Sequence, residues 1–159
     1  MKSFTIGVYN STKQEFFGKL SDNKIDTFCD IRQRRGVRGA QYAFVNSQRL
    51  QETLKELNIN YWHVANLAPQ KEIRELQKKA DLANKEAKRQ RKNLGEAFTS
   101  EYKNRVLKDF DFQVFLNELE DNGANRIALF CVEEKPEACH RSLVSDRLRN
   151  DFNLETIHQ

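Results

Sequence analysis

Short apolar strands alternate with helix-favouring stretches along the first half of the chain. The segment from Ser3 to Val8 alternates apolar and polar positions, which predicts a first strand. Two further apolar runs, from Ile25 to Ile31 and from Ile59 to Val64, predict the second and third strands. A helix is predicted after the first strand, where Thr12 and Glu15 form a capping-box pattern. Successive β-α-β units of this kind favour a mainly parallel sheet with right-handed crossovers.

A long charged stretch from Pro69 to Leu107 interrupts this alternation. Its apolar stripe is thin, so we expect part of it to project from the body, and Gly95 should divide it into two helices. Four elements then follow with the patterns of helix, strand, helix and strand: Phe110 to Leu119, Arg126 to Val132, Cys139 to Asn150, and Leu154 to Ile157. The sequence therefore predicts a single α/β domain over residues 1–159. We expect a three-layer Rossmann-like fold with a mainly parallel sheet and a charged helical insert at about 70–108.

Composition narrows the class of protein. Of the 159 residues, 38% are hydrophobic and 31% are charged, which is ordinary for a globular protein. No run approaches the roughly 18 apolar residues of a membrane span, so we expect no membrane partner. The N-terminus enters a strand pattern at once, without a signal-peptide core, which favours a cytoplasmic location. Three cysteines are an odd number and argue against a disulfide framework.

Positive charge is concentrated in the insert. The chain carries a net charge of +4, and between Lys71 and Lys92 there are nine Lys or Arg residues against four Asp or Glu residues. Such a local excess of positive charge can bind the phosphates of a nucleic acid. A solvated helix face explains the same pattern without a partner.

The richest chemistry follows the predicted fourth strand. Two thiols, a carboxylate, an imidazole and a guanidinium fall between Cys131 and Arg141. Open α/β sheets place their ligand crevices at the carboxyl ends of strands, so this segment is the main candidate site. Glu133 is a candidate general acid or base, and pairing with Arg141 is its structural alternative.

Cys139, His140 and Arg141 open the predicted last helix. The first turn of a helix exposes backbone N–H groups that attract anions, and a thiol there can have a lowered pKa. Cys139 is therefore a candidate nucleophile, while His140 and Arg141 are candidates for binding a phosphate or carboxylate. In the alternative, Cys139 is buried, His140 faces solvent and Arg141 pairs with a carboxylate.

Further candidates lie at the ends of the second and third strands. Asp30 and Arg32 have the alternate spacing that places both on one face, which makes them candidates for binding a substrate; an ion pair of Asp30 with an arginine is the simplest structural alternative. His63 is an acid or base candidate if it points into the crevice, and otherwise a residue of the sheet rim. The loop after the second strand adds side chains suited to an anionic substrate: Arg34, Arg38 and Tyr42.

Motifs for metals and cofactors are absent. Cys131, Cys139 and His140 are soft ligand types, but adjacent Cys and His residues at a helix start rarely point at one ion, and no CxxC or HExxH motif occurs. The chain also has no GxGxxG, GxxxxGK[ST] or GxSxG motif and no Cys-x5-Arg loop. We therefore expect no metal and no cofactor.

These residues resemble the domain-of-unknown-function 488 family of bacterial and archaeal proteins. The matching segments are Thr5-Ile6-Gly7, Phe16 through Leu20, Asp30-Ile31-Arg32, Tyr61-Trp62-His63-Val64, Cys131-Val132-Glu133 and Cys139-His140-Arg141. The resemblance implies an α/β fold and a shared crevice, with no assigned reaction. Two segments depart from the family pattern: Gly7-Val8-Tyr9 stands where Gly-His-Ser is common, and Leu67-Ala68-Pro69 where Leu-Gly-Gly is common.

Three functional hypotheses follow. In the first, the chain is an enzyme of open reaction class that acts on a phosphate-bearing small molecule or nucleic acid, with arginines binding the anion and Glu133 or His63 moving protons. In the second, it is a non-catalytic nucleic-acid-binding or adaptor protein that uses the basic stretch from Lys78 to Lys92. In the third, it is a scaffold that has lost activity, an interpretation favoured by the departure at Val8-Tyr9.

Overall fold

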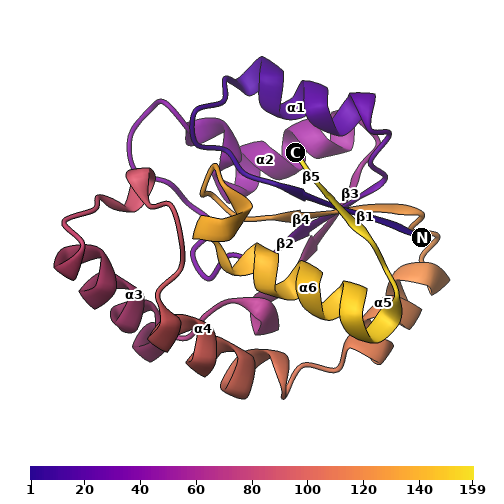
Figure 1. The fold of residues 1–159 in the computed structure, drawn as a ribbon. Helices are drawn as coiled ribbons and strands as arrows, with labels where there is room; N and C mark the ends of the chain where they lie inside the picture. The colour runs from indigo at the N-terminus through magenta and orange to yellow at the C-terminus, as the bar shows by residue number, and fades with distance from the viewer.

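A five-stranded, all-parallel sheet forms the centre of the molecule (Figure 1). The computed structural model describes residues 1–159, apart from the side chain of residue 89. The strand order is β3-β2-β4-β1-β5. The strands are β1 (Lys2–Ile6), β2 (Thr27–Asp30), β3 (Asn60–His63), β4 (Arg126–Phe130) and β5 (Thr156–His158). The predicted α/β class and parallel sheet are confirmed.

Helices cover both faces of the sheet and make three layers (Figure 1). One face carries α1 (Lys13–Asp22) and α2 (Ser47–Glu56), and the other carries the later helices. The later helices are α3 (Lys71–Ala83), α4 (Glu96–Tyr102), α5 (Phe112–Asp121) and α6 (His140–Phe152). None of the helices in the described part of the chain combines the length and apolar character that a bilayer span requires.

Local sequence signals explain where several of these elements begin. The Thr12 hydroxyl accepts a hydrogen bond from the Glu15 N–H at 3.2 Å, and the Glu15 carboxylate accepts one from the Thr12 N–H at 2.7 Å. This reciprocal pair is the predicted capping box, and it satisfies two backbone donors at the start of α1. Beneath α1, the Phe16 ring lies 5.4 Å from the Phe130 ring, and Phe28 lies 5.1 Å from Phe130. Burial of these rings anchors the helix on the sheet.

The strand order brings three strand ends together. Because β4 lies between β1 and β2, the segments that follow these strands are neighbours. Beyond the ladder, the N–H groups of Val8 and Tyr9 donate to the carbonyl of Val132 at 3.1 and 3.0 Å, and Ile31 N–H donates to Phe130 at 3.2 Å. The connection from β2 leads outward to β3 at one edge of the sheet, and the connection from β4 leads past β1 to β5 at the other edge, so the direction reverses between β2 and β4. Such a switch point is where open α/β sheets form ligand crevices.

The insert folds back on the body. Gly95 was predicted to divide the insert into two helices, and it is the N-cap residue of α4. The preceding helix, α3, ends earlier, at Ala83. Gly95 N–H donates to Gln77 on α3 at 2.8 Å, and Leu94 N–H donates to the carbonyl of Glu137 at 3.1 Å. The expectation that part of the insert projects from the body stays a prediction: α3 packs against α4 and buries Ile73, Gln77 and Asp81, while most of its other residues are exposed (Figure 1).

The remaining turns are short. After α4, residues Lys103–Leu107 form a π-helical turn. Single 3-10 turns occur at Ala43–Val45, Ala65–Leu67, Lys88–Gln90 and Pro136–Ala138.

Gly7→Ala tests the close approach of β1 to the turn after β4. A Cβ atom at Gly7 would overlap the carbonyl oxygen of Glu133, so we expect a loss of about 1 to 3 kcal/mol in the free energy of unfolding. Gly18→Ala is the matched control, because Gly18 lies inside α1 with no atom within 4 Å of the added carbon. That variant should gain up to about 1 kcal/mol. Urea denaturation measures both, and equal effects would contradict the packing argument.

Candidate functional site

A cleft of about 650 Å³ opens at the carboxyl edge of the sheet. The loop after β2, helix α3 and the segment from Lys88 to Leu94 form its walls. The residues after β4 and the start of α6 form its floor, where Cys131, Glu133, Cys139 and His140 lie. The cleft lies at the edge of the sheet where the sequence predicted a site.

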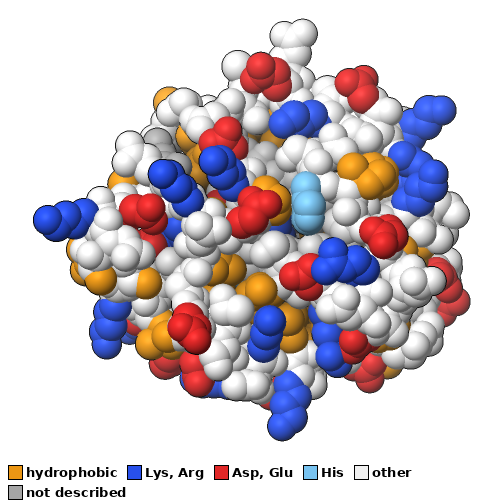
Figure 2. Space-filling view, in the orientation of Figure 1, with side chains coloured by type: hydrophobic (Ala, Val, Ile, Leu, Met, Phe, Trp, Pro, Cys, Tyr) orange, Lys and Arg blue, Asp and Glu red, His pale blue; other side chains and the backbone are white. Residues whose placement is uncertain are grey.

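Basic side chains outnumber acidic ones in this cleft. Among the described side chains, the lining includes eight Lys or Arg residues: Arg32, Arg34, Arg38, Lys71, Arg74, Lys78, Lys88 and Arg91. It includes three acidic residues: Glu75, Asp81 and Glu133. On the face seen in Figure 1, acidic and basic side chains are interspersed (Figure 2), so this surplus is not continued over that face. The cleft is suited to an anionic ligand.

Arg32 is held in the cleft by a buried carboxylate. Its Nε and Nη2 atoms donate to Asp30 at 2.9 and 2.7 Å, and Nη2 also donates to the Val45 carbonyl at 2.9 Å. The hydroxyl of Tyr61 donates to the same carboxylate at 2.9 Å. The guanidinium stacks over the Phe130 ring at 4.5 Å, and its Nη1 atom makes no hydrogen bond with the described residues. The expected ion pair of Asp30 with an arginine is present, its partner is Arg32, and it leaves one nitrogen of the guanidinium without a partner among the described residues.

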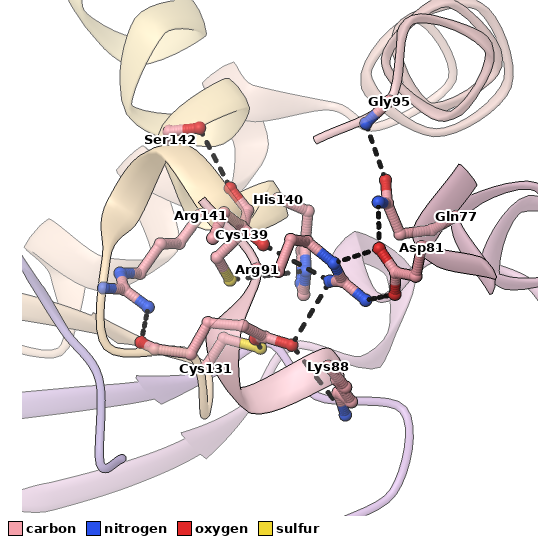
Figure 3. A network of polar contacts seen from close by, with 12 residues as sticks. Gln77, Asp81, Lys88, Arg91, Gly95, Cys131, Cys139, His140, Arg141 and Ser142 are labelled. Atoms are coloured by element: carbon pink, nitrogen blue, oxygen red, sulfur yellow. Dashed lines mark hydrogen bonds and ion pairs between the residues drawn. The ribbon is translucent and has the colours of Figure 1, made fainter. Parts of the chain in front are cut away.

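Two thiols and an imidazole meet at the floor. The Sγ atoms of Cys131 and Cys139 and a ring nitrogen of His140 all lie within 4.8 Å of one another. The Cys139 Sγ atom is 3.8 Å from Nδ1 of His140 (Figure 3). His140 Nε2 lies 3.0 Å from the carbonyl oxygen of Ile31. Because a carbonyl oxygen can only accept a hydrogen bond, Nε2 is the donor and carries the ring proton. The neighbouring Cys and His do converge, contrary to the geometric argument made from the sequence.

The local backbone explains this convergence. The Pro136–Ala138 turn ends in Cys139, which has extended dihedral angles of −139° and 144° and precedes α6 as its cap. Successive side chains therefore leave the helix start in a geometry different from that of two helical neighbours. Cys139 and His140 are both buried, so neither belongs to the solvated surface.

Glu133 lies beside the thiols and two cations. Its carboxylate accepts the Cys131 S–H at 3.3 Å and lies 3.7 Å from Arg91 Nη1 and 3.8 Å from Lys88 Nζ. Burial raises the pKa of the Glu133 carboxyl, and the neighbouring Cys131 raises it further. The hydrogen bond to Cys139 and burial raise the pKa of the Cys131 thiol to about 12. Arg91 and Lys88 are the compensating charges for the buried carboxylate.

A polar relay fixes Arg91 in place (Figure 3). Its Nε and Nη2 atoms donate to the two oxygens of Asp81 at 2.8 and 2.5 Å. Gln77 donates to Asp81 at 2.8 Å while its carbonyl accepts from Gly95 N–H at 2.8 Å. The insert therefore places the guanidinium of Arg91, in a fixed orientation, beside the floor of the cleft.

Four residues predicted for the site do not line the cleft. Asp30 is fully buried and accepts hydrogen bonds from Arg32. Arg141 is fully buried and donates to the main-chain carbonyls of Glu133 and Glu134 at 2.5 and 2.7 Å, so it shapes the turn and does not line the cleft. His63 lies outside the lining, and its Nε2 atom donates to the Arg32 carbonyl at 3.0 Å. Tyr42 is buried, and its hydroxyl accepts a hydrogen bond from the Asn10 N–H at 2.9 Å.

The match to known proteins covers most of the chain. A family model described as a domain of unknown function, DUF488, matches residues 12–148. The chain belongs to the DUF488 family. No curated protein and no solved structure matches it. Because the family description assigns no reaction, the function of this DUF488 chain must be argued from the cleft.

Some site residues were missed by sequence reasoning. The sequence placed Cys131 in the candidate segment without giving it a role, and it gave the insert no part in the crevice after β4. Both bring groups to the floor of the DUF488 cleft, the insert through Lys88, Arg91 and Asp81. The signal available in the sequence was the basic run of the insert, which does not say where its helices turn.

Asp81→Asn tests the relay that holds Arg91. Burial raises the pKa of Asp81, but the hydrogen bonds from Arg91 and Gln77 outweigh burial and lower it below its ordinary value. A lowered folded pKa means that the stabilisation is present above the unfolded pKa of about 3.9 and is lost as pH falls through the folded pKa. We expect a cost of about 2 kcal/mol at pH 7 that shrinks in acid.

Chemical denaturation between pH 7 and pH 2 measures this difference. Asp151→Asn is the control, because it removes an exposed partner of Arg147 and should cost less than about 1 kcal/mol. A cost for Asp81→Asn that stays constant as the pH falls would contradict the relay.

Proposed function

We propose that the chain is an enzyme that acts on a phosphate-bearing substrate, a nucleotide or a nucleic acid. The observation that carries this proposal is the juxtaposition in one cleft of surplus positive charge with a buried carboxylate, an imidazole and two thiols. Binding alone explains the positive charge. It does not explain buried reactive groups at the bottom of the same cleft.

Arg32 is the proposed anchor for the anion. A guanidinium recognises phosphate through paired N–H donors, and a guanidinium that is already fixed loses little entropy on binding. Asp30 supplies that fixed orientation, since it holds Nε and Nη2 and leaves Nη1 unpartnered among the described residues. Arg34, Arg38, Lys71 and Lys78 add exposed charge around the rim.

Glu133 is the proposed proton carrier. It lies at the floor, in contact with the Cys131 thiol and near two cations that neutralise it. Proton transfer by a positioned carboxyl is typical of hydrolysis and group transfer at phosphate. The cations of the cleft would stabilise the negative charge that grows in the transition state. The thiol–imidazole cluster beside Glu133 completes the reactive floor.

The rival hypothesis of a nucleic-acid-binding or adaptor protein predicts basic side chains on an open face. In this chain Arg74, Lys78, Lys88 and Arg91 of the insert line the cleft, as do Arg34 and Arg38 of the loop after β2. This convergence favours a ligand that enters the cleft. It favours the enzyme over a protein that binds only along its surface.

Lys78→Gln and Lys79→Gln test the binding half of the proposal. Both lysines are exposed on α3, but Lys78 lines the cleft and Lys79 does not. With a labelled single-stranded oligonucleotide as the probe, Lys78→Gln should weaken binding and reduce the slope of log K against log salt by about 1. Lys79→Gln should leave the slope unchanged. Fluorescence anisotropy at several salt concentrations measures both, and equal slopes would place the ligand outside the cleft.

Glu133→Gln tests the catalytic half. Against a panel of nucleotides and short oligonucleotides, we expect turnover to fall by about 100-fold or more while binding of the same substrate is retained. Glu75→Gln is the control, since Glu75 lines the cleft from the exposed side of α3. Product release is followed by chromatography. Tight binding of the panel without turnover in the unmodified chain would favour the adaptor hypothesis.

A further inference from the structure

We propose that Cys131, Cys139 and His140 form a zinc site with three protein ligands and a fourth position open to the cleft. The site goes beyond the proposed function, because metal binding does not depend on which anion enters the cleft. It also assigns a role to Cys131, for which the proposed function names no chemical step.

The spacing of the ligand atoms fits one tetrahedral ion. Zinc binds thiolate sulfur at about 2.3 Å and imidazole nitrogen at about 2.0 to 2.1 Å, so two ligands of one ion lie about 3.5 to 3.8 Å apart. The Cys139 Sγ to His140 Nδ1 distance is 3.8 Å, and all three ligand atoms lie within 4.8 Å of one another. Shifts of less than about 1 Å would complete the geometry.

His140 is oriented as a ligand. A histidine that binds a metal usually donates its other ring N–H to a carbonyl or carboxylate, which fixes the tautomer. Nε2 of His140 donates to the Ile31 carbonyl, and Nδ1 faces the thiols. The free lone pair is thereby directed into the cluster. Because Ile31 follows β2, the sheet itself holds the ring.

The charge of the floor suits a divalent cation. Two thiolates neutralise Zn²⁺, and the thiols release their protons when the metal binds. Glu133 would then add one negative charge beside Cys131, where Arg91 and Lys88 lie 3.7 and 3.8 Å from its carboxylate. These two cations limit repulsion between the carboxylate and the thiolates. Thiolate and imidazole ligands favour zinc over the hard cations Mg²⁺ and Ca²⁺.

Three protein ligands leave one coordination position open. Structural zinc sites have four protein ligands, whereas sites with three hold a water or a substrate in the fourth position. All three ligands line the cleft, which gives the ion a path of entry. Glu133 lies next to the cluster without belonging to its ligand set.

Metal analysis of the full chain tests the site. The chain is expressed without a histidine tag in zinc-supplemented medium and purified without chelators, and we expect about one zinc per chain by elemental analysis. The zinc is then replaced by Co²⁺, which should give the intense visible absorption of a tetrahedral site with a thiolate-to-cobalt band. Cys131→Ser, Cys139→Ser and His140→Gln should each weaken zinc affinity by about 100-fold or more.

Two controls match the ligand variants. Cys29→Ser changes a buried thiol of β2, and His63→Gln changes a histidine that also bonds to a carbonyl; neither should alter metal content. Zinc should raise the melting temperature of the unmodified chain and of the controls but not that of the ligand variants. This second measurement remains informative if a ligand variant is less stable.

Other outcomes would overturn the site. They are a reduced chain that binds neither zinc nor cobalt, ligand variants that keep the metal, or a Cys131–Cys139 disulfide in the purified chain, detected by counting free thiols after denaturation. The Lys78→Gln variant separates this test from the proposed function. It should retain the zinc in full, so loss of oligonucleotide binding and loss of metal are distinguishable.

Discussion

A buried guanidinium holds the backbone turn on which the floor of the cleft depends. Arg141 is fully buried and bonds to the carbonyls of Glu133 and Glu134, and Gly7 packs against the first of these carbonyls. Two strand-end segments and the first turn of α6 are thereby fixed to one another. With the turn fixed, Cys131 and Glu133 face the cleft, and α6 begins where Cys139 and His140 can meet them. A charged side chain at 0% exposure is costly to bury, and its bonds to main-chain carbonyls offset part of that cost.

Two buried acid–base pairs position cations on opposite sides of the cleft. Asp30 holds Arg32 from β2, and Asp81 holds Arg91 from the insert. In each pair the carboxylate occupies two donor atoms of the guanidinium. The pairs contribute less to stability than their short distances imply, because desolvation opposes the attraction. Their main effect is orientation: each guanidinium is fixed before a ligand arrives, which lowers the entropy lost on binding.

The sequence predicted the sheet because its strands are short apolar runs with capping signals between them, and Thr12 with Glu15 behaves as that pattern requires. It placed Asp30 and Arg32 on one face because alternate strand residues share a face, and it expected Asp30 to pair with an arginine without deciding which. It could not predict the partner of Arg141, because a guanidinium can bind a phosphate or two main-chain carbonyls. The path of the backbone after β4 determines which of these partners it meets. The buried face of α3 includes Gln77 and Asp81, so hydrophobic periodicity gave no sign that this helix packs inward.

Val8 and Tyr9, where the sequence analysis expected a departure from the family pattern, bear on the hypothesis of an inactive scaffold. Tyr9 lines the cleft, and its ring lies 5.3 Å from the ring of Tyr42. The replaced position therefore belongs to a wall of the cleft. The thiols, the imidazole and the carboxylate of the floor come from the segment after β4 and from the start of α6, so changes after β1 remove none of them. The bulky Tyr9 ring in the wall of the cleft limits which ligands can enter. It does not displace the reactive groups of the floor. Under the proposed function, a difference at Val8 and Tyr9 would therefore alter which substrate enters the cleft and would leave the reactive groups in place.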